Sequence, residues 1–232
     1  MTDLTISFKD TAQISRVSDK DVFHAFMVEG SSFEGPFDIP VLDSIQVDVK
    51  GLISFSEARS LKDADSSKFV HFFTDDGRFE CFWNSPGRYI EKLKGFAGVI
   101  EPDFSTCPNF PEAIKIYNTY RNRACSRWLQ NNGIKVIPNV RLDLNSVGYS
   151  LSGIPKKSTI CIGSNGCIKN VKNRERFKES LHYVVDVLEP KNIIVYGSDA
   201  YGVFDYPRKM GIPISLFPNE MFRRDRGDTC EC

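Results

Sequence analysis

The segment NRERFKESLHYVVDVLEPKNIIVY, residues 173–196, decides the fold class of this 232-residue chain. Apolar side chains recur in it at three- and four-residue steps, and this period predicts an amphipathic helix over Asn173–Leu188. Pro190 ends the helix, and the apolar run Asn192–Tyr196 that follows predicts a buried strand. A helix that leads directly into such a strand is typical of α/β proteins with parallel sheets.

The same pattern extends outward from this segment. Two more helices are predicted over Trp83–Phe96 and Pro111–Gln130, and the second of these stops at an Asn-Asn-Gly turn. Short runs of β-branched and aromatic residues predict eight strands in all. These are Ile39–Leu42, Leu52–Phe55, Phe69–Phe73, Gly98–Phe104, Ile134–Val140, Thr159–Gly163, Asn192–Tyr196 and Ile212–Phe217.

Eight strands that alternate with helices make a distorted or incomplete (β/α)8-like barrel the first choice of fold. The span from Ile39 to Phe217 is shorter than the roughly 200 residues of small barrels, so the early units must lack full helices. An open doubly wound parallel sheet is the alternative. We divide the chain into an irregular N-terminal leader or hairpin (residues 1–38), the α/β domain (39–220) and a flexible tail (221–232).

Composition narrows the class of protein. Thirty basic residues balance thirty acidic ones, which argues against a protein that coats nucleic acid by bulk charge, so any polyanion site must be local. No stretch is apolar enough to span a membrane, and the start of the chain lacks the pattern of a signal peptide. With seven cysteines, an odd count, reduced thiols and a cytoplasmic protein without membrane contact are expected.

Polar residues follow the predicted strands where each one ends, and in parallel α/β folds function gathers at this carboxyl edge. Asp103 lies between Pro102 and Phe104, where burial would raise its pKa toward that of a general acid or base. Asp75 or Asp76 could supply a second carboxylate, and the three together could hold Mg²⁺ or Mn²⁺. The alternatives are an Asp-Asp-Gly turn and, for Asp103, a helix cap or loop carboxylate.

The second predicted helix carries polar residues on its apolar face. Asn118 and Arg121 fall on that face at helical spacing. A buried arginine needs a partner, and Asp103 at the end of the preceding strand is the natural one. The pair is interpreted either as a substrate clamp or as a structural lock between helix and sheet. Arg123 and Arg127 lie on the other side of the helix and are predicted to be solvated.

Two Gly-Ser turns follow adjacent predicted strands, at Gly163-Ser164 and Gly197-Ser198. Phosphate often binds at this position in barrels, on backbone amides at the start of a helix. Arg141, from the strand before, could add a charge-assisted contact to such a phosphate. The alternative is ordinary loop chemistry, because Gly-Ser is common after a strand.

A resemblance to a known family covers well over half the chain. It lies in five stretches: LISFSEA (52–58), VHFFTDDGRFECFWNSPGRYIEKL (70–93), PDFS (102–105), NTYRNRACSRWLQNNGIKVIPNVR (118–141) and IIVYGS (193–198). In these stretches the chain resembles an uncharacterised family of bacterial phages and mobile elements, domain of unknown function 4417. The resemblance implies a phage or mobile-element origin, hence the host cytoplasm as location, and makes nucleotides or nucleic acid the favoured ligands.

Two functions remain open. The first is a hydrolase that acts on a phosphate-containing substrate, either a nucleotide or nucleic acid. The second is a non-catalytic protein that engages a host, phage or replication protein or sequesters a nucleotide. Apart from a divalent cation no cofactor is predicted, because the histidines are isolated and the cysteines lack zinc spacing. The two functions differ in whether the predicted catalytic residues meet in one concave site: Asp75, Asp103, Arg121 and Asn139.

Overall fold

The computed structural model describes residues 21, 23–141 and 146–219, which form a mixed α/β fold with two parallel sheets. The first sheet has the order β3 (Gly51–Ser54), β4 (Lys68–His71), β5 (Gly98–Ile100) and β6 (Val136–Ile137). The second has the order β7 (Thr159–Gly163), β8 (Asn192–Tyr196) and β9 (Ile214–Phe217). A parallel bridge between Asn139 and Cys161 joins the end of β6 to β7, so the strands follow one another in chain order.

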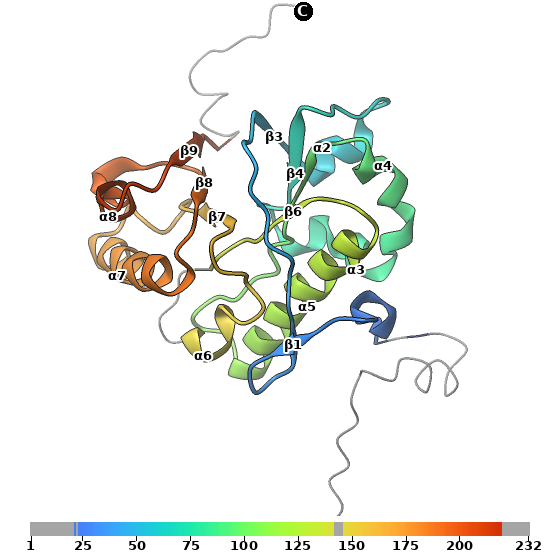
Figure 1. The fold of residues 1–232 in the computed structure, drawn as a ribbon, viewed down its shortest axis with the longest axis horizontal. Coiled ribbons are helices and arrows are strands. Elements are labelled where there is room, and N and C mark those ends of the chain that lie inside the picture. Colours follow the sequence, from blue (N-terminus) through green and yellow to red (C-terminus); the bar gives the residue numbers. More distant parts are fainter. Residues whose placement is uncertain (1–20, 22, 142–145, 220–232) are drawn as a thin grey trace, which may run out of the picture.

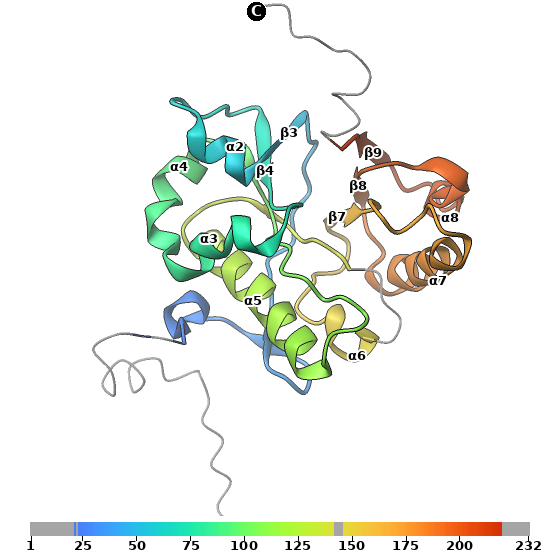
Figure 2. The same cartoon turned by 180° about the vertical axis from the view of Figure 1, so that it is seen from behind.

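The helices flank the strands, as Figure 1 shows with α2 and α4 at one side and α7 and α8 at the other. Seen from behind, α5 runs from α3 toward α6 (Figure 2). The α-helices are α2 (Phe55–Ser60), α3 (Glu80–Asn84), α4 (Ile90–Lys94), α5 (Glu112–Asn131), α6 (Val147–Ser150), α7 (Val171–Leu188) and α8 (Asp205–Lys209). The 3₁₀ turns are η1 (Ala25–Val28), η2 (Asp76–Arg78), η3 (Pro86–Arg88) and η5 (Ala200–Gly202). No helix in the described ranges is long and apolar enough to cross a membrane.

The α7–β8 unit forms as its sequence predicts. The Asn170 side chain caps α7 by accepting a hydrogen bond from the Asn173 amide at 3.2 Å, and Glu189 ends the helix in the left-handed region just before Pro190. The apolar stripe of the helix is buried against the second sheet. Burial of such a stripe, rather than helix propensity, supplies most of the stability of a helix in a protein.

On the second sheet, the face turned away from α7 packs with one face of the first sheet in a single cluster of apolar side chains. Each of the strands β4 to β8 contributes one side chain to this cluster, and the neighbouring residues point to the other face, as the period of a strand requires. The members are Phe69, Ile100, Ile137, Cys161 and Ile194, together with Val49. The segment before β3 is tied to the second sheet, because the Thr159 amide donates to the Ile45 carbonyl at 2.7 Å. The parallel pairing of β4, β5 and β6 places the carboxyl ends of these strands beside one another.

Two predicted elements are wrong in detail. Ile39–Leu42 is not the first strand of a parallel sheet, because β2 (Ile39–Pro40) pairs antiparallel with β1 (Phe33–Glu34). Positive φ angles at Gly35 and Asp38 fold the chain back at once, so the nearest partner is the preceding run. The boundary drawn between residues 38 and 39 therefore cuts through a hairpin, and the tail at 221–232 lies outside the described residues.

The helix predicted over Trp83–Phe96 is broken into α3, η3 and α4. Pro86 is the cause, because a proline forces the residue before it out of the helical region, and Ser85 has φ −152° and ψ 60°. Ile90, Leu93 and Phe96 of the predicted helix are buried nonetheless and Tyr89 is partly buried, so the pattern located the core-facing side chains correctly.

Candidate functional site

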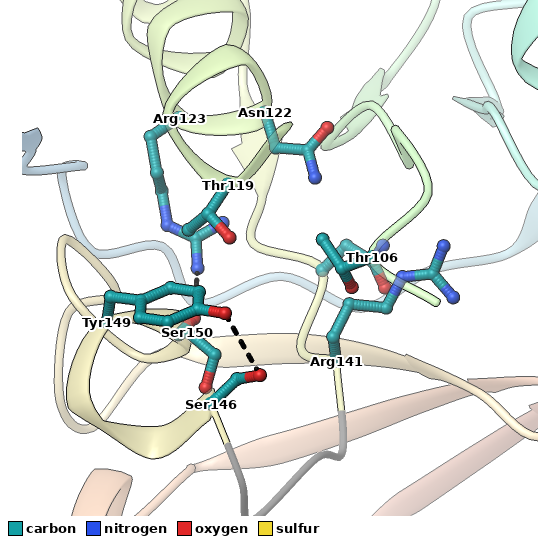
Figure 3. A pocket seen from close by; sticks show the side chains of 9 residues that line it. Thr106, Thr119, Asn122, Arg123, Arg141, Ser146, Tyr149 and Ser150 are labelled. Carbon is teal, nitrogen blue, oxygen red and sulfur yellow. Dashed lines mark hydrogen bonds between the residues drawn. The ribbon is translucent and has the colours of Figure 1, made fainter. Parts of the chain in front are cut away.

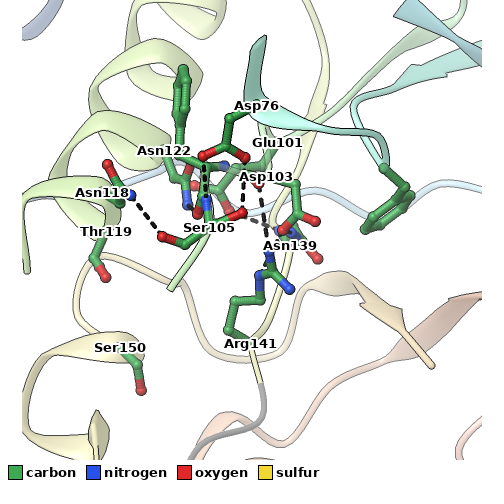
Figure 4. Close-up of polar contacts among 12 residues, drawn as sticks. Asp76, Glu101, Asp103, Ser105, Asn118, Thr119, Asn122, Asn139, Arg141 and Ser150 are labelled. Atoms are coloured by element: carbon green, nitrogen blue, oxygen red, sulfur yellow. Dashed lines mark hydrogen bonds and ion pairs between the residues drawn. The ribbon is translucent and has the colours of Figure 1, made fainter. Parts of the chain in front are cut away.

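The carboxyl ends of neighbouring strands bring Asp103, Asn139 and Arg141 together (Figure 4). Asn139 Nδ2 donates to Asp103 Oδ1 at 2.6 Å, and Arg141 Nε lies 2.7 Å from the same oxygen. The Asp103 side chain is 11% exposed and that of Arg141 is 40% exposed. A buried carboxylate therefore holds a guanidinium at the rim of the sheet edge.

Burial raises the pKa of Asp103 above its ordinary value, and the charge of Asp76 adds to this effect. The Arg141 guanidinium and the hydrogen bond from Asn139 act in the opposite direction, but desolvation is the largest cause. Raised carboxyl pKa values are typical of acid–base sites, although structural ion pairs shift them too.

The three carboxylates predicted as Mg²⁺ ligands are not assembled. Asp75 is turned to solvent, with 93% of its side chain exposed. Asp76 accepts hydrogen bonds from the Ser105 amide at 3.1 Å and from the Ser105 hydroxyl at 2.9 Å (Figure 4). Among the described residues no group of three or more His, Cys, Asp or Glu side chains could hold a metal ion.

The predicted pair between Arg121 and Asp103 is wrong. Arg121 Nη2 donates to both carboxylate oxygens of Glu80, at 2.6 and 2.5 Å, and its guanidinium lies 3.6 Å from the centre of the Phe104 ring. Asn118 donates to the Ser105 carbonyl at 2.6 Å. Both side chains therefore hold α5 against its neighbours, as the structural alternative proposed, but through another carboxylate.

Arg123, which was predicted to be solvated, is instead 2% exposed and paired with Glu101, which is fully buried. Its guanidinium also donates to the carbonyls of Ser150 at 2.9 Å and Ser152 at 3.0 Å. The pair thus connects the end of β5, helix α5 and helix α6. Arg127 is not fully solvated either, since its side chain is 19% exposed and its Nη1 lies 2.9 Å from Asp43 Oδ1.

A small pocket opens beside this cluster, between α5, α6 and the strand ends (Figure 3). Its walls carry two guanidinium groups, two amides and five hydroxyls, and none of the lining side chains is acidic. The lining residues are Thr106, Thr119, Asn122, Arg123, Asn139, Arg141, Ser146, Tyr149 and Ser150. The Tyr149 hydroxyl is itself held by Glu112 at 2.6 Å and by Ser146 at 3.1 Å.

The two Gly-Ser turns lie against each other. The Ser164 hydroxyl donates to the Ser198 carbonyl at 2.7 Å and accepts from the Ser198 amide at 2.8 Å. Gly197 allows this approach, because a Cβ there would lie 2.5 Å from the Ser164 hydroxyl. The turns are not among the residues that line the pocket beside Arg141.

Of the predicted site residues, the structure unites Asp103, Asn139 and Arg141 and leaves Asp75 and Arg121 apart. Sequence reasoning missed Glu101 and the pocket walls from α6. A signal for Glu101 existed, because it is a charged residue directly after the apolar run of β5, where only a buried cation could accommodate it.

Comparisons with known proteins find one family model and two phage proteins that are similar to this chain. Residues 6–209 match the family described as Domain of unknown function (DUF4417). The "Gene 1 protein" of Mycobacterium phage L5 is 36% identical over 129 residues, which are 55% of this chain and 56% of that protein. The "Gene 1 protein" of Mycobacterium phage D29 is 32% identical over 139 residues, which are 60% of this chain and 52% of that protein. The chain thus spans about half the length of these curated relatives, and no solved structure matches it.

Proposed function

This chain belongs to the Domain of unknown function (DUF4417) family, as its sequence predicted, and from that premise we propose that it binds a phosphate-containing ligand. The site is the carboxyl edge of β5 and β6. The observation that carries the proposal is the half-exposed Arg141 guanidinium, held by buried Asp103 at the mouth of a pocket without acidic lining.

The geometry suits an anion for two reasons. Asp103 engages Arg141 through Nε, and Nη2 makes only a long contact of 3.4 Å to the Asp103 carbonyl, so the outer edge of the guanidinium can bind a phosphate oxygen. The pocket wall beside it carries hydroxyl and amide groups and no acidic side chain, so nothing in that wall repels an anion held at the rim. Because the curated relatives are phage proteins, nucleotides and nucleic acid are the phosphate-containing ligands we favour.

Replacing Arg141 with glutamine is expected to weaken the binding of phosphate-containing ligands about 10-fold or more, because the charge-assisted contact is lost. Inorganic phosphate, nucleoside monophosphates and triphosphates, and a short single-stranded DNA are titrated by calorimetry after a thermal-shift screen. Arg208→Gln is the matched control, since Arg208 is 43% exposed and also paired with an aspartate, Asp199. If none of these ligands raises the melting temperature, or if Arg141→Gln binds as the unmodified protein does, the proposal is wrong.

Hydrolysis of the bound ligand is the second candidate function, and the buried Asp103 favours it. Its Oδ2 accepts no hydrogen bond from the described residues, so this oxygen is available to activate a water molecule. A base must be ionised to act, so turnover is expected to fall as the pH drops through the pKa of Asp103, above the usual value of about 3.9. Asp103→Asn should abolish turnover of a nucleotide without preventing folding. Equal turnover in that variant would exclude Asp103 as the base and would leave ligand binding as the only function supported.

We also propose that the two sheets form one incomplete barrel. The parallel strands follow chain order without the reversal of an open doubly wound sheet, and the Asn139–Cys161 bridge joins them, which supports this arrangement. No ladder in the described residues pairs β3 with β9.

The described cysteines are free thiols, which supports a reducing compartment such as the host cytoplasm.

A further inference from the structure

We infer that the ligand of this site is a sugar phosphate, whose phosphate binds Arg141 and whose hydroxyl donates to Asn139. This inference rests on the proposed function and narrows its ligand class. The evidence comes from three features: an unsatisfied acceptor on Asn139, the carboxylate of Asp103 next to it, and the size of the cavity beside them.

Asn139 is 4% exposed and is held from two sides. Its backbone amide donates to Glu101 Oε2 at 2.7 Å, and its Nδ2 donates to Asp103 Oδ1 at 2.6 Å. The second bond also settles which end of the amide is which, because the reverse orientation would set two oxygens against each other. The remaining atom, Oδ1, is buried and has no hydrogen-bond partner among the described residues. Buried acceptors without a donor are rare, so this one calls for an explanation.

A ligand that brings a donor would satisfy that acceptor. Asp103 Oδ2, on the neighbouring carboxylate, also accepts no hydrogen bond from the described residues. An ionised phosphate offers only acceptor oxygens, so it could not satisfy the buried Asn139 Oδ1 and would be repelled by the Asp103 carboxylate. A hydroxyl group can donate to either one. The site therefore combines a cation for a phosphate with acceptors for a hydroxyl.

The size of the cavity also indicates that a hydroxyl group binds inside it and a phosphate group at its rim. Asn139 and Arg141 both line it, and its volume is about 10 Å³, the room that one water molecule needs. A hydroxyl group has the size of a water molecule, whereas a phosphate group is several times larger. The phosphate must then stay at the rim, where the Arg141 side chain is 40% exposed, while a hydroxyl enters. A phosphorylated sugar, free or as part of a nucleotide, carries a phosphate and hydroxyl groups on one small ligand.

The test compares phosphate esters with and without hydroxyl groups. Ribose 5-phosphate and glycerol 3-phosphate are titrated by calorimetry against methyl phosphate, which is a monoester of similar charge but has no hydroxyl. The hydroxyl-bearing esters are expected to bind at least about 10-fold more tightly, because they alone satisfy the buried acceptor. In Asn139→Leu, which keeps the shape of the side chain but has no acceptor, this preference should shrink to about 3-fold or less.

Asn192→Leu is the matched control, since Asn192 also has a buried, unpartnered Oδ1 but lies at the amino end of β8. It should keep the full preference for ribose 5-phosphate. If Asn139→Leu does not fold, Asn139→Ala removes the acceptor without introducing a branched apolar side chain, and the ligand comparison on the unmodified protein stands by itself. Equal affinities for ribose 5-phosphate and methyl phosphate, both weakened by Arg141→Gln, would overturn the inference and leave the proposed function intact. Absence of binding by every ester would overturn both.

Discussion

Replacing Arg123 with alanine should lower the free energy of unfolding by about 3–5 kcal/mol, a large part of the stability of a single domain. The substitution leaves the carboxylate of Glu101 fully buried without its cation. It also removes the donors that hold the carbonyls of Ser150 and Ser152, and with them the α6 wall of the pocket. Urea denaturation monitored by tryptophan fluorescence measures the effect.

Arg208→Ala is the control for this loss. The ion pair of Arg208 with Asp199 is partly exposed on both sides, so its removal should cost less than about 1 kcal/mol. A double replacement, Glu101→Leu with Arg123→Met, should be more stable than Arg123→Ala, because neither charge is then stranded. If Arg123→Ala costs no more than Arg208→Ala, the buried pair does not hold these elements together.

Gly153→Ala should be destabilising by about 3 kcal/mol or more, or should prevent folding. Gly153 has φ +77°, and a Cβ there would lie only 2.2 Å from the carbonyl oxygen of Pro40. The close approach of the two segments allows two hydrogen bonds that stabilise the fold. The Gly153 amide donates to Glu34 Oε2 at 2.6 Å, and the Gly153 carbonyl accepts from the Leu42 amide at 2.9 Å. These bonds join the β1–β2 hairpin to the chain that follows α6. The melting temperature and urea midpoint report the loss.

Gly133→Ala separates the steric effect from the conformational one. Gly133 has nearly the same φ, +79°, but a Cβ added there would meet no other atom within 4 Å. Only the strain of a left-handed backbone is added, so the expected cost is about 1 kcal/mol. Equal losses at both glycines would show that the contact with Pro40 is relieved by a small shift of the hairpin.

The part of the candidate site that lies at the carboxyl ends of the strands was predictable from the sequence. Asp103, Asn139 and Arg141 lie at the carboxyl ends of two predicted parallel strands, and parallel neighbours end at the same edge, so their meeting follows from the strand assignment alone. Asp75 follows a strand as well, yet 93% of its side chain is exposed, because β4 ends at His71 and Asp75 lies in the loop just before the η2 turn.

The pairing of charges on α5 shows where this reasoning stops. Arg121 and Arg123 are two positions apart on the helix and therefore point in different directions, and both are buried. Asp103 lies at the end of the strand that precedes α5 and was the natural partner for Arg121, but Glu80, at the start of α3, pairs with Arg121 instead. Arg123 forms an ion pair with Glu101, and Asp103 forms one with Arg141.

By itself, the sequence determined the α/β class, the amphipathic face of α7 and the polar character of the carboxyl edge, because these depend on periodicity and on the order of strands along the chain. Only the tertiary structure decided which carboxylate meets which guanidinium, which side of α5 is buried, and that Asn139 retains an unsatisfied oxygen. These depend on distances between segments far apart in the chain, and such distances are set by the packing of all elements together.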